Sequence, residues 1–117
     1  MPRTVLIVDD HPSFRAGARR MLEASGYAVI GEAEDGAAAI AAARELEPEL
    51  VLLDVQLPDL DGFEVAERLH EGGEGPAIVL TSSREGSDFG SAVAESPARG
   101  FVTKGELSGT TLAALAG

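Results

Sequence analysis

The chain has 117 residues, no cysteine and a formal net charge of −11. This length suits one domain with one core, so we expect residues 1–117 to form a single domain without disulfides or thiolate metal sites. The acidic balance argues against direct binding to nucleic acid, which needs clustered lysine and arginine, although solubility alone explains the charge equally well.

The apolar segments are short. The longest uninterrupted apolar run, Ala37–Ala43, is far too short to cross a bilayer. The amino terminus runs through Val5–Val8 straight into Asp9, without the longer apolar stretch and cleavage site of a signal peptide. We therefore expect a soluble, cytoplasmic protein with no membrane partner.

Five apolar runs rich in valine, isoleucine and leucine have the length of strands buried on both faces of a parallel sheet. In chain order they are Val5–Val8, Tyr27–Ile30, Leu50–Leu53, Ala77–Leu80 and Phe101–Val102. Helical patterns follow the first three runs, and they cover Phe14–Leu22 after Pro12, the alanine-rich segment Ala38–Leu46, and Phe63–Leu69.

The last two helical patterns are weaker. The segment Ser87–Glu95 is disrupted by Gly90 and flanked by Gly86, and the final pattern, from Ser108, contains Gly109. Glycine costs about 1 kcal/mol in a helix interior. We therefore expect the fourth and fifth helices to be the least stable elements.

Strand and helix alternate five times along the chain. This order predicts an α/β fold with a five-stranded parallel sheet, helices on both faces and right-handed crossovers. For five strands the usual arrangement is the flavodoxin-like, doubly wound (βα)5 fold with strand order 2-1-3-4-5.

Polar residues follow four of the five strands. They are Asp9–Asp10, Asp54, Thr81–Ser83 and Thr103–Lys104, whereas only Gly31 and Glu32 follow the second strand. In the order 2-1-3-4-5, the first and third strands are neighbours where the order reverses, and open α/β sheets form their sites there, at the carboxyl ends.

The residue types at this edge suit phosphoryl transfer. Three carboxylates repel one another unless a hard cation holds them, and Mg²⁺ prefers oxygen ligands and keeps positions open for a phosphate. Lys104 and the Thr81 hydroxyl add a charge and a donor for phosphate oxygens. Asp54 stands alone on the central strand, so it is the economical nucleophile, with Asp9 and Asp10 as the metal pair.

Four segments resemble one family in order and spacing over essentially the whole chain. The segments VLIVDDHPSFR, LVLLDVQLPDLDG, IVLTSS and ARGFVTK are similar to those of receiver domains of two-component response regulators. The opening Asp-Asp-His-Pro and the glycine after Lys104 resemble the subgroup that carries C-terminal helix-turn-helix output domains.

The resemblance implies a phosphorylation-dependent signalling switch rather than an enzyme. Asp54 would accept a phosphoryl group from a histidine kinase or phosphotransfer protein. Asp10 would bind Mg²⁺ directly, Asp9 would do so directly or through water, and the backbone carbonyl of Gln56 would be a further ligand.

The resemblance also assigns the switching residues. Thr81 would move its hydroxyl toward the phosphate, Phe101 would be the aromatic switch, and Lys104 would pair with the phosphate. The partner-binding face would then change, with homodimerisation as one outcome. Gly105 stands where the family often has a cis-proline, which implies a trans peptide and a looser loop. Ser82 replaces a smaller residue, which would slow phosphate access or hydrolysis.

Plainer roles remain open for several of these residues. Asp10 could cap the first helix, and Asp61-Gly62 is typical of a turn and helix start. Ser82, Ser83 and Ser87 could cap the fourth helix. His11 is read as a solvated loop residue in preference to a metal ligand.

Two other functions compete with the switch. A phosphatase-type enzyme with an aspartyl-phosphate intermediate resembles Asp-x-Asp, but Val55-Gln56 follows Asp54. A flavin-binding domain of similar topology needs a Ser/Thr/Gly phosphate loop after the first strand, where Asp9 and Asp10 would repel the phosphate.

Overall fold

The computed structural model describes residues 3–116, so residues 1, 2 and 117 of the predicted domain lie outside the described part. The elements run in the order β1 (Thr4–Val8), α1 (Pro12–Ala24), β2 (Ala28–Ala33), α2 (Gly36–Leu46), β3 (Leu50–Asp54), α3 (Gly62–Leu69), η1 (Glu71–Gly73), β4 (Ala77–Ser82), η2 (Gly86–Phe89), α4 (Ala92–Glu95), β5 (Gly100–Thr103), η3 (Lys104–Glu106) and α5 (Gly109–Ala116).

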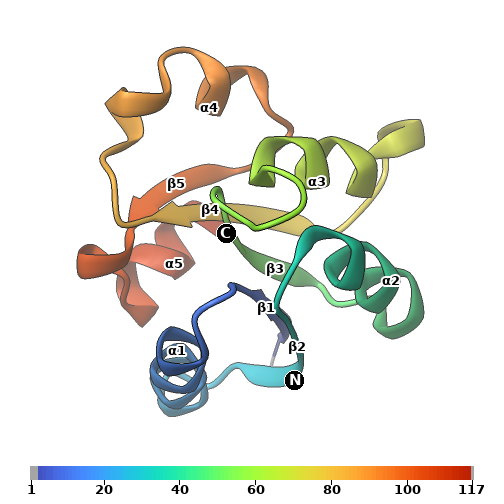
Figure 1. Cartoon of the computed structure of the whole chain (residues 1–117). Helices are drawn as coiled ribbons and strands as arrows, with labels where there is room; N and C mark the ends of the chain where they lie inside the picture. Colours follow the sequence, from blue (N-terminus) through green and yellow to red (C-terminus); the bar gives the residue numbers. More distant parts are fainter. Residues whose placement is uncertain (1–2, 117) are drawn as a thin grey trace.

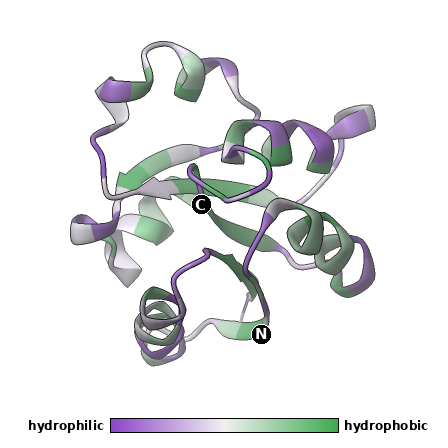
Figure 2. Cartoon of the chain, viewed as in Figure 1, coloured by the Kyte–Doolittle hydropathy of each residue, from purple (hydrophilic) through white to green (hydrophobic). Residues whose placement is uncertain are grey.

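The five strands form one parallel sheet in the order β2-β1-β3-β4-β5, which confirms the predicted fold (Figure 1). All five residues of β3 and all six of β4 are buried. Continuous apolar sequence is required there because helices cover both faces of these strands. Figure 2 shows hydrophobic residues concentrated in the strands and hydrophilic ones in the loops and on the helices.

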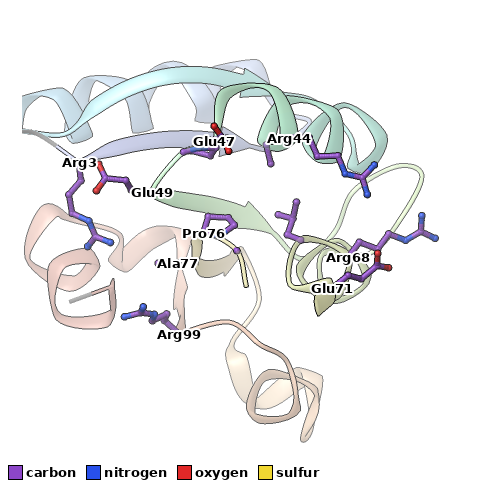
Figure 3. A pocket seen from close by; sticks show the side chains of 13 residues that line it. Arg3, Arg44, Glu47, Glu49, Arg68, Glu71, Pro76, Ala77 and Arg99 are labelled. Carbon is purple, nitrogen blue, oxygen red and sulfur yellow. The ribbon is translucent and has the colours of Figure 1, made fainter. Parts of the chain in front are cut away.

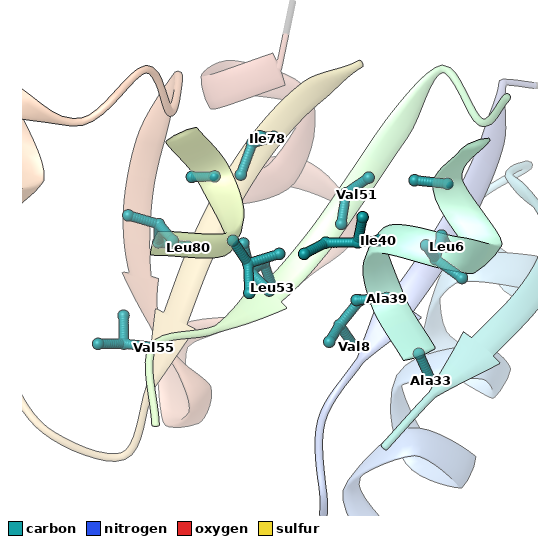
Figure 4. Packing of buried hydrophobic residues seen from close by; sticks show 13 residues of the cluster. Leu6, Val8, Ala33, Ala39, Ile40, Val51, Leu53, Val55, Ile78 and Leu80 are labelled. Atoms are coloured by element: carbon teal, nitrogen blue, oxygen red, sulfur yellow. The ribbon is translucent and has the colours of Figure 1, made fainter. Parts of the chain in front are cut away.

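Alternate residues of each strand feed two cores on opposite faces of the sheet. On one face, Val51 and Leu53 of β3 pack with α2 and α3, as Figure 4 shows around Ile40. On the other face, Leu50 and Leu52 pack with Ala18 and Leu22 of α1 and with Leu112 and Ala116 of α5. Because all five strands are parallel, their carboxyl ends lie at the same edge of the sheet, where sites form in open α/β folds.

The fourth helix differs from the prediction. The single segment Ser87–Glu95 is divided into the 3-10 turn η2 and the four-residue α4, and neither contains a buried residue. Gly90 separates the two pieces with a φ of 61°, a conformation that glycine adopts without strain. The prediction of one continuous helix is therefore wrong, and the low stability expected for this region stays a prediction.

The proposed serine caps are wrong. The N-cap residues of η2 and α4 are Glu85 and Ser91, and neither side chain makes a capping hydrogen bond. Asp10 does not cap α1 either, because His11 occupies the N-cap position. Asp61 does cap α3, since its Oδ1 accepts a 2.8 Å hydrogen bond from the backbone N–H of Glu64.

Candidate functional site

The carboxyl ends of β1 and β3 bring four potential ligands together. One ligand atom from each of Asp9, Asp10, His11 and Asp54 lies within 4.8 Å of the others. Asp54 is the last residue of β3, and Asp9 directly follows the neighbouring strand β1. Asp10 and His11 come next in the loop that leads into α1. The three aspartates predicted to share a site therefore do so.

Asp54 is a buried carboxylate at the end of the central strand. It is 2% exposed, and its Oδ1 accepts a 3.0 Å hydrogen bond from the backbone N–H of Gln56. Burial raises the pKa of Asp54 above its ordinary value, and the nearby charge of Asp9 adds to the rise, whereas the Gln56 N–H and Lys104 oppose it. Asp9 and Asp54 therefore repel each other when both are ionised, and a nearby positive charge reduces this repulsion.

Lys104 lies between these two carboxylates. Its Nζ is 2.7 Å from Asp9 Oδ2 and 3.4 Å from Asp54 Oδ2, and 4.5 Å from the centroid of the Phe14 ring. Its shortest carboxylate contact is therefore with Asp9, and the predicted pairing of this lysine with a phosphate on Asp54 stays a prediction. Lys104, the first residue of η3 directly after β5, thus neutralises part of the site's negative charge.

Thr81 faces Asp54 across the sheet, since the two residues are partners in the β3–β4 register. Its Oγ1 is fully buried and has no hydrogen-bond partner among the described residues. A buried hydroxyl without a hydrogen-bond partner costs about 1–3 kcal/mol. Ser82 is also buried, and its Oγ accepts a 3.1 Å hydrogen bond from the N–H of Arg84.

Phe101 of β5 lies beneath η2. Its ring centroid is 5.8 Å from that of Phe89, which is in turn 5.8 Å from that of Phe63 on α3. The three rings form a partly buried row between the fourth-helix region and α3. No cis peptide occurs among residues 3–116, so the peptide before Gly105 is trans, as expected.

His11 is the first site residue that sequence reasoning undervalued. Its ring is 63% exposed, as a solvated loop residue would be, but its Nδ1 lies 3.0 Å from both Asp9 Oδ1 and Asp10 Oδ1. Its backbone N–H also donates to Asp9 Oδ1 at 2.8 Å. The available signal was the position of His11 directly after an acidic pair.

Arg15 was missed altogether. Its guanidinium donates to the backbone carbonyl of Asp9 and pairs with Glu32 at 3.0 Å, and its side chain is only 15% exposed. Arg19, one turn later on α1, also pairs with Glu32 but does not reach the loop. Glu32 of β2, which sequence analysis left without chemistry, thereby helps to orient the backbone of the acidic loop.

The loop after Asp54 is fastened to α2. The carboxylate of Asp59 accepts hydrogen bonds from the N–H groups of Gly36 (2.7 Å) and Ala37 (3.0 Å), which lowers the pKa of Asp59. At the end of this loop, a Cβ on Gly62 would lie 2.5 Å from the Asp54 carbonyl oxygen. Gly62 therefore permits a close approach to the site as well as the predicted turn.

The donor set fits a hard divalent cation. The converging groups are three carboxylates and one imidazole, and Asp9 is fully buried with an Oδ2 that has an ion pair but no aligned hydrogen bond. Mg²⁺ takes oxygen ligands of this kind and retains water at its other positions. The residues present thus suit the cation that the acidic cluster predicted.

A separate hollow lies at the end of the sheet where the strands begin, opposite to the acidic site. It has a volume of about 740 Å³, and Arg3, Glu49, Pro76 and Arg99 at its rim precede or begin strands (Figure 3). Arg3 and Arg99 each donate to the carbonyl of Ala116 at 3.3 Å, which stabilises the end of α5. None of the three aspartates of the acidic site borders this hollow.

Within residues 3–116, no helix combines the length and the apolar character that a bilayer crossing requires.

Comparison with known proteins gives one consistent family. The model of the response regulator receiver domain matches residues 5–116. BvgA of Bordetella pertussis is 41% identical over 106 residues, which cover 91% of this chain and 51% of BvgA. The response regulator GacA of Pseudomonas viridiflava is 36% identical over 102 residues, covering 86% of this chain and 48% of GacA.

Solved structures agree with this similarity. A two-component response regulator of the LuxR family from an Aurantimonas species superposes with a TM-score of 0.87 and 34% identity, over 99% of this chain and 86% of that one. The chain spans about half the length of the curated relatives it matches. The similarity therefore concerns one part of those longer proteins.

Proposed function

This chain belongs to the response regulator receiver domain family, and on that premise we propose that it is a phosphorylation-dependent signalling switch whose acceptor is Asp54. The relatives, which include a regulator of the LuxR family, fit the subgroup with helix-turn-helix output domains. The observation that carries the proposal is the convergence of the buried Asp54 with Asp9, Asp10 and Lys104 at one sheet edge.

In the proposed reaction, a carboxylate oxygen of Asp54 forms a bond to phosphorus while the bond from phosphorus to the donor breaks. The donor, a phosphohistidine of a kinase or phosphotransfer protein, keeps the electron pair. Lys104 is close enough to Asp54 to stabilise negative charge first on the carboxylate and then on the phosphoryl oxygens. The unpaired hydroxyl of Thr81 supplies a further donor from the neighbouring strand.

Mg²⁺ is the proposed cofactor. Receiver domains generally bind it at an acidic pocket, and here Asp9, Asp10, Asp54 and the backbone carbonyl of Gln56 would hold it. When bound, the cation would neutralise negative charge on the carboxylates and the incoming phosphoryl group. Asp10, whose side chain is 36% exposed, is the most accessible of the three aspartates to an arriving ion.

The proposed output is a change in the face built from η2, α4, β5 and α5. A phosphoryl group that draws in Thr81 and Lys104 would act directly on the strands before these helices, and Phe101 would fill the space that Thr81 leaves. We propose that this cytoplasmic switch, with residues 1–117 as one receiver domain, uses the face for a protein partner, including a second copy of itself. It would not bind nucleic acid directly.

The test of the acceptor is phosphorylation by acetyl phosphate. Intact-mass measurement should show one added phosphoryl group when Mg²⁺ is present, and none in Asp54→Asn or when Mg²⁺ is chelated. Asp61→Asn is a matched control, because Asp61 is an exposed helix cap outside the acidic cluster. Persistence of the adduct in Asp54→Asn would refute the assignment, and repeated turnover of a phosphomonoester would favour the phosphatase alternative.

The metal and the switch have separate tests. Calorimetry should show that Asp10→Ala loses Mg²⁺ affinity while keeping its fold. Hydrogen exchange with Mg²⁺ and beryllofluoride should change over residues 81–96 and 101–115. Changes confined to the loop after Asp54 would contradict the proposed output while leaving phosphate binding intact.

A further inference from the structure

The hollow at the end of the sheet where the strands begin gathers positive charge in an acidic chain. Of the eight arginines in the sequence, four line it, namely Arg3, Arg44, Arg68 and Arg99. Among residues 3–116, only Arg68 of these four forms an ion pair, with Glu64 at 3.3 Å. Because acidic residues outnumber basic ones by 20 to 9, three arginines without a carboxylate partner at one hollow indicate a site for an external anion.

Arg3 and Arg99 share one acceptor. Each donates to the backbone carbonyl of Ala116 at 3.3 Å, so two positive charges lie side by side on one oxygen at the end of α5. This carbonyl carries only a partial negative charge. The remaining guanidinium donors match the oxygens of a phosphate in pairs, and a bound oxyanion would relieve the repulsion between the two cations. Figure 3 shows both arginines at one side of the hollow.

Helix ends explain the arginines only in part. Arg44 and Arg68 lie in the last turns of α2 and α3, where a cation is favourable. Arg3 and Arg99, in contrast, directly precede β1 and β5 and belong to no helix. Arg99 is exposed and Arg3 is half-buried, so an arriving ligand can reach both.

Glu47, which also lines the hollow, has a strained backbone. With φ at 48° and ψ at 56°, it is the one non-glycine residue of positive φ among residues 3–116. Glycine would end α2 there without strain. Strain of this kind concentrates where a side chain serves a ligand, and a carboxylate at this position offers acceptors for hydroxyl groups.

We propose that this hollow binds a small organic phosphate whose body carries hydroxyl groups, with the phosphate between Arg3 and Arg99 and the hydroxyl groups toward Glu47. The volume of about 740 Å³ is within the range of small-molecule sites. None of the three aspartates of the acidic site borders the hollow. Binding therefore needs no Mg²⁺ and goes beyond the proposed function.

Calorimetry in metal-free buffer, with glucose 6-phosphate as the probe, tests the site while the acidic cluster holds no cation for a phosphate. Arg99→Gln, which keeps a donor for the Ala116 carbonyl, should weaken binding by about tenfold. Arg20→Gln is the matched control, because it removes the same charge from α1 outside the hollow, and it should weaken binding by less than about twofold. No binding by the parent, or equal losses in the two variants, would overturn the proposal.

The role of Glu47 is tested by the ratio of the affinities for glucose 6-phosphate and inorganic phosphate, in which general charge effects cancel. Glu47→Gly should raise the Tm, because the strain is relieved, and should lower this ratio by about fivefold. An unchanged ratio would refute the contact between Glu47 and the hydroxyl groups.

Nuclear magnetic resonance locates the ligand without any substitution. The side-chain Nε–H signals of Arg3 and Arg99 should shift on titration with glucose 6-phosphate, whereas those of Arg15 and Arg19 should not. Shifts at Arg15, beside the acidic loop, with none at Arg3 and Arg99 would mean that the phosphate binds at the opposite end of the sheet, which contradicts the proposal and leaves phosphorylation of Asp54 untouched.

Discussion

The acidic edge, formed by Asp9, Asp10 and Asp54, and the fourth-helix region, formed by η2 and α4, are built differently. Every residue of β3 is buried. Arg15 of α1 holds the carbonyl of Asp9, and Asp59, in the loop after Asp54, fastens that loop to the start of α2. In contrast, η2 and α4 contain no buried residue and no side-chain cap, and they stand away from the sheet in Figure 1.

This difference has a functional meaning. Repelling carboxylates can be held together only by a stiff frame, whereas a surface that responds to their state must cost little to rearrange. Phe89 attaches η2 to the rest of the molecule through its ring contacts with Phe63 of α3 and Phe101 of β5. The molecule therefore combines a rigid site with a loosely attached face.

The largest expected contrast is in core truncation. Leu53→Ala, at a fully buried position of β3, should lower the free energy of unfolding by about 3–5 kcal/mol. Phe89→Ala, in the partly buried η2, should cost about 1 kcal/mol despite the larger side chain. Urea denaturation measures both. Equal costs would show that the fourth-helix region is as firmly packed as the sheet.

A second contrast uses two glycines. In Gly62→Ala the new Cβ would meet the backbone of Asp54 and Val55 at 2.5–2.7 Å, which should destabilise the fold by about 1–3 kcal/mol. Gly105→Ala meets no atom within 4 Å and should change stability by less than about 1 kcal/mol. Thermal unfolding of both variants tests the comparison, and tolerance of Gly62→Ala would mean that the loop after Asp54 is not held close.

The raised pKa of Asp54 predicts a pH-dependent contrast. Because its pKa in the fold lies above the ordinary value of 3.8, the stability that its neutral form contributes is present below pH 3.8 and is lost as pH rises through the folded pKa. Asp54→Asn should therefore have a higher Tm than the parent at neutral pH. This advantage should shrink as the solution is acidified. A constant difference from pH 4 to pH 8 would contradict this origin.

The smallest contrast separates two arginines of α1. Arg15→Ala should cost about 1 kcal/mol, because a largely buried guanidinium that holds the Asp9 carbonyl is lost. Arg19→Ala removes only a surface ion pair and should cost less than about 0.5 kcal/mol. Hydrogen exchange should accelerate at residues 9–11 in the Arg15 variant alone. Equal exchange rates at residues 9–11 in the two variants would show that Arg15 does not hold this loop in place.

Much of this molecule was predictable from local sequence. The five apolar runs predicted the strands, and the alternation with helices predicted the parallel order that brings Asp9, Asp10 and Asp54 together. The fourth helix was predicted as one segment because its spacing of apolar residues is helical, but Gly90 and the absence of burial divide it. The serine caps failed because hydroxyl residues near a helix are common and only backbone geometry selects among them.

The sequence by itself determined the strands, the strand order and the edge at which the acidic residues meet, because periodicity is local and the crossover rule is general. Tertiary structure alone decided that Lys104 contacts Asp9 most closely, that Arg15 holds the carbonyl of Asp9, and that His11 lies between two carboxylates. These contacts depend on side-chain directions and on the packing of helices across the sheet, which no spacing along the chain encodes.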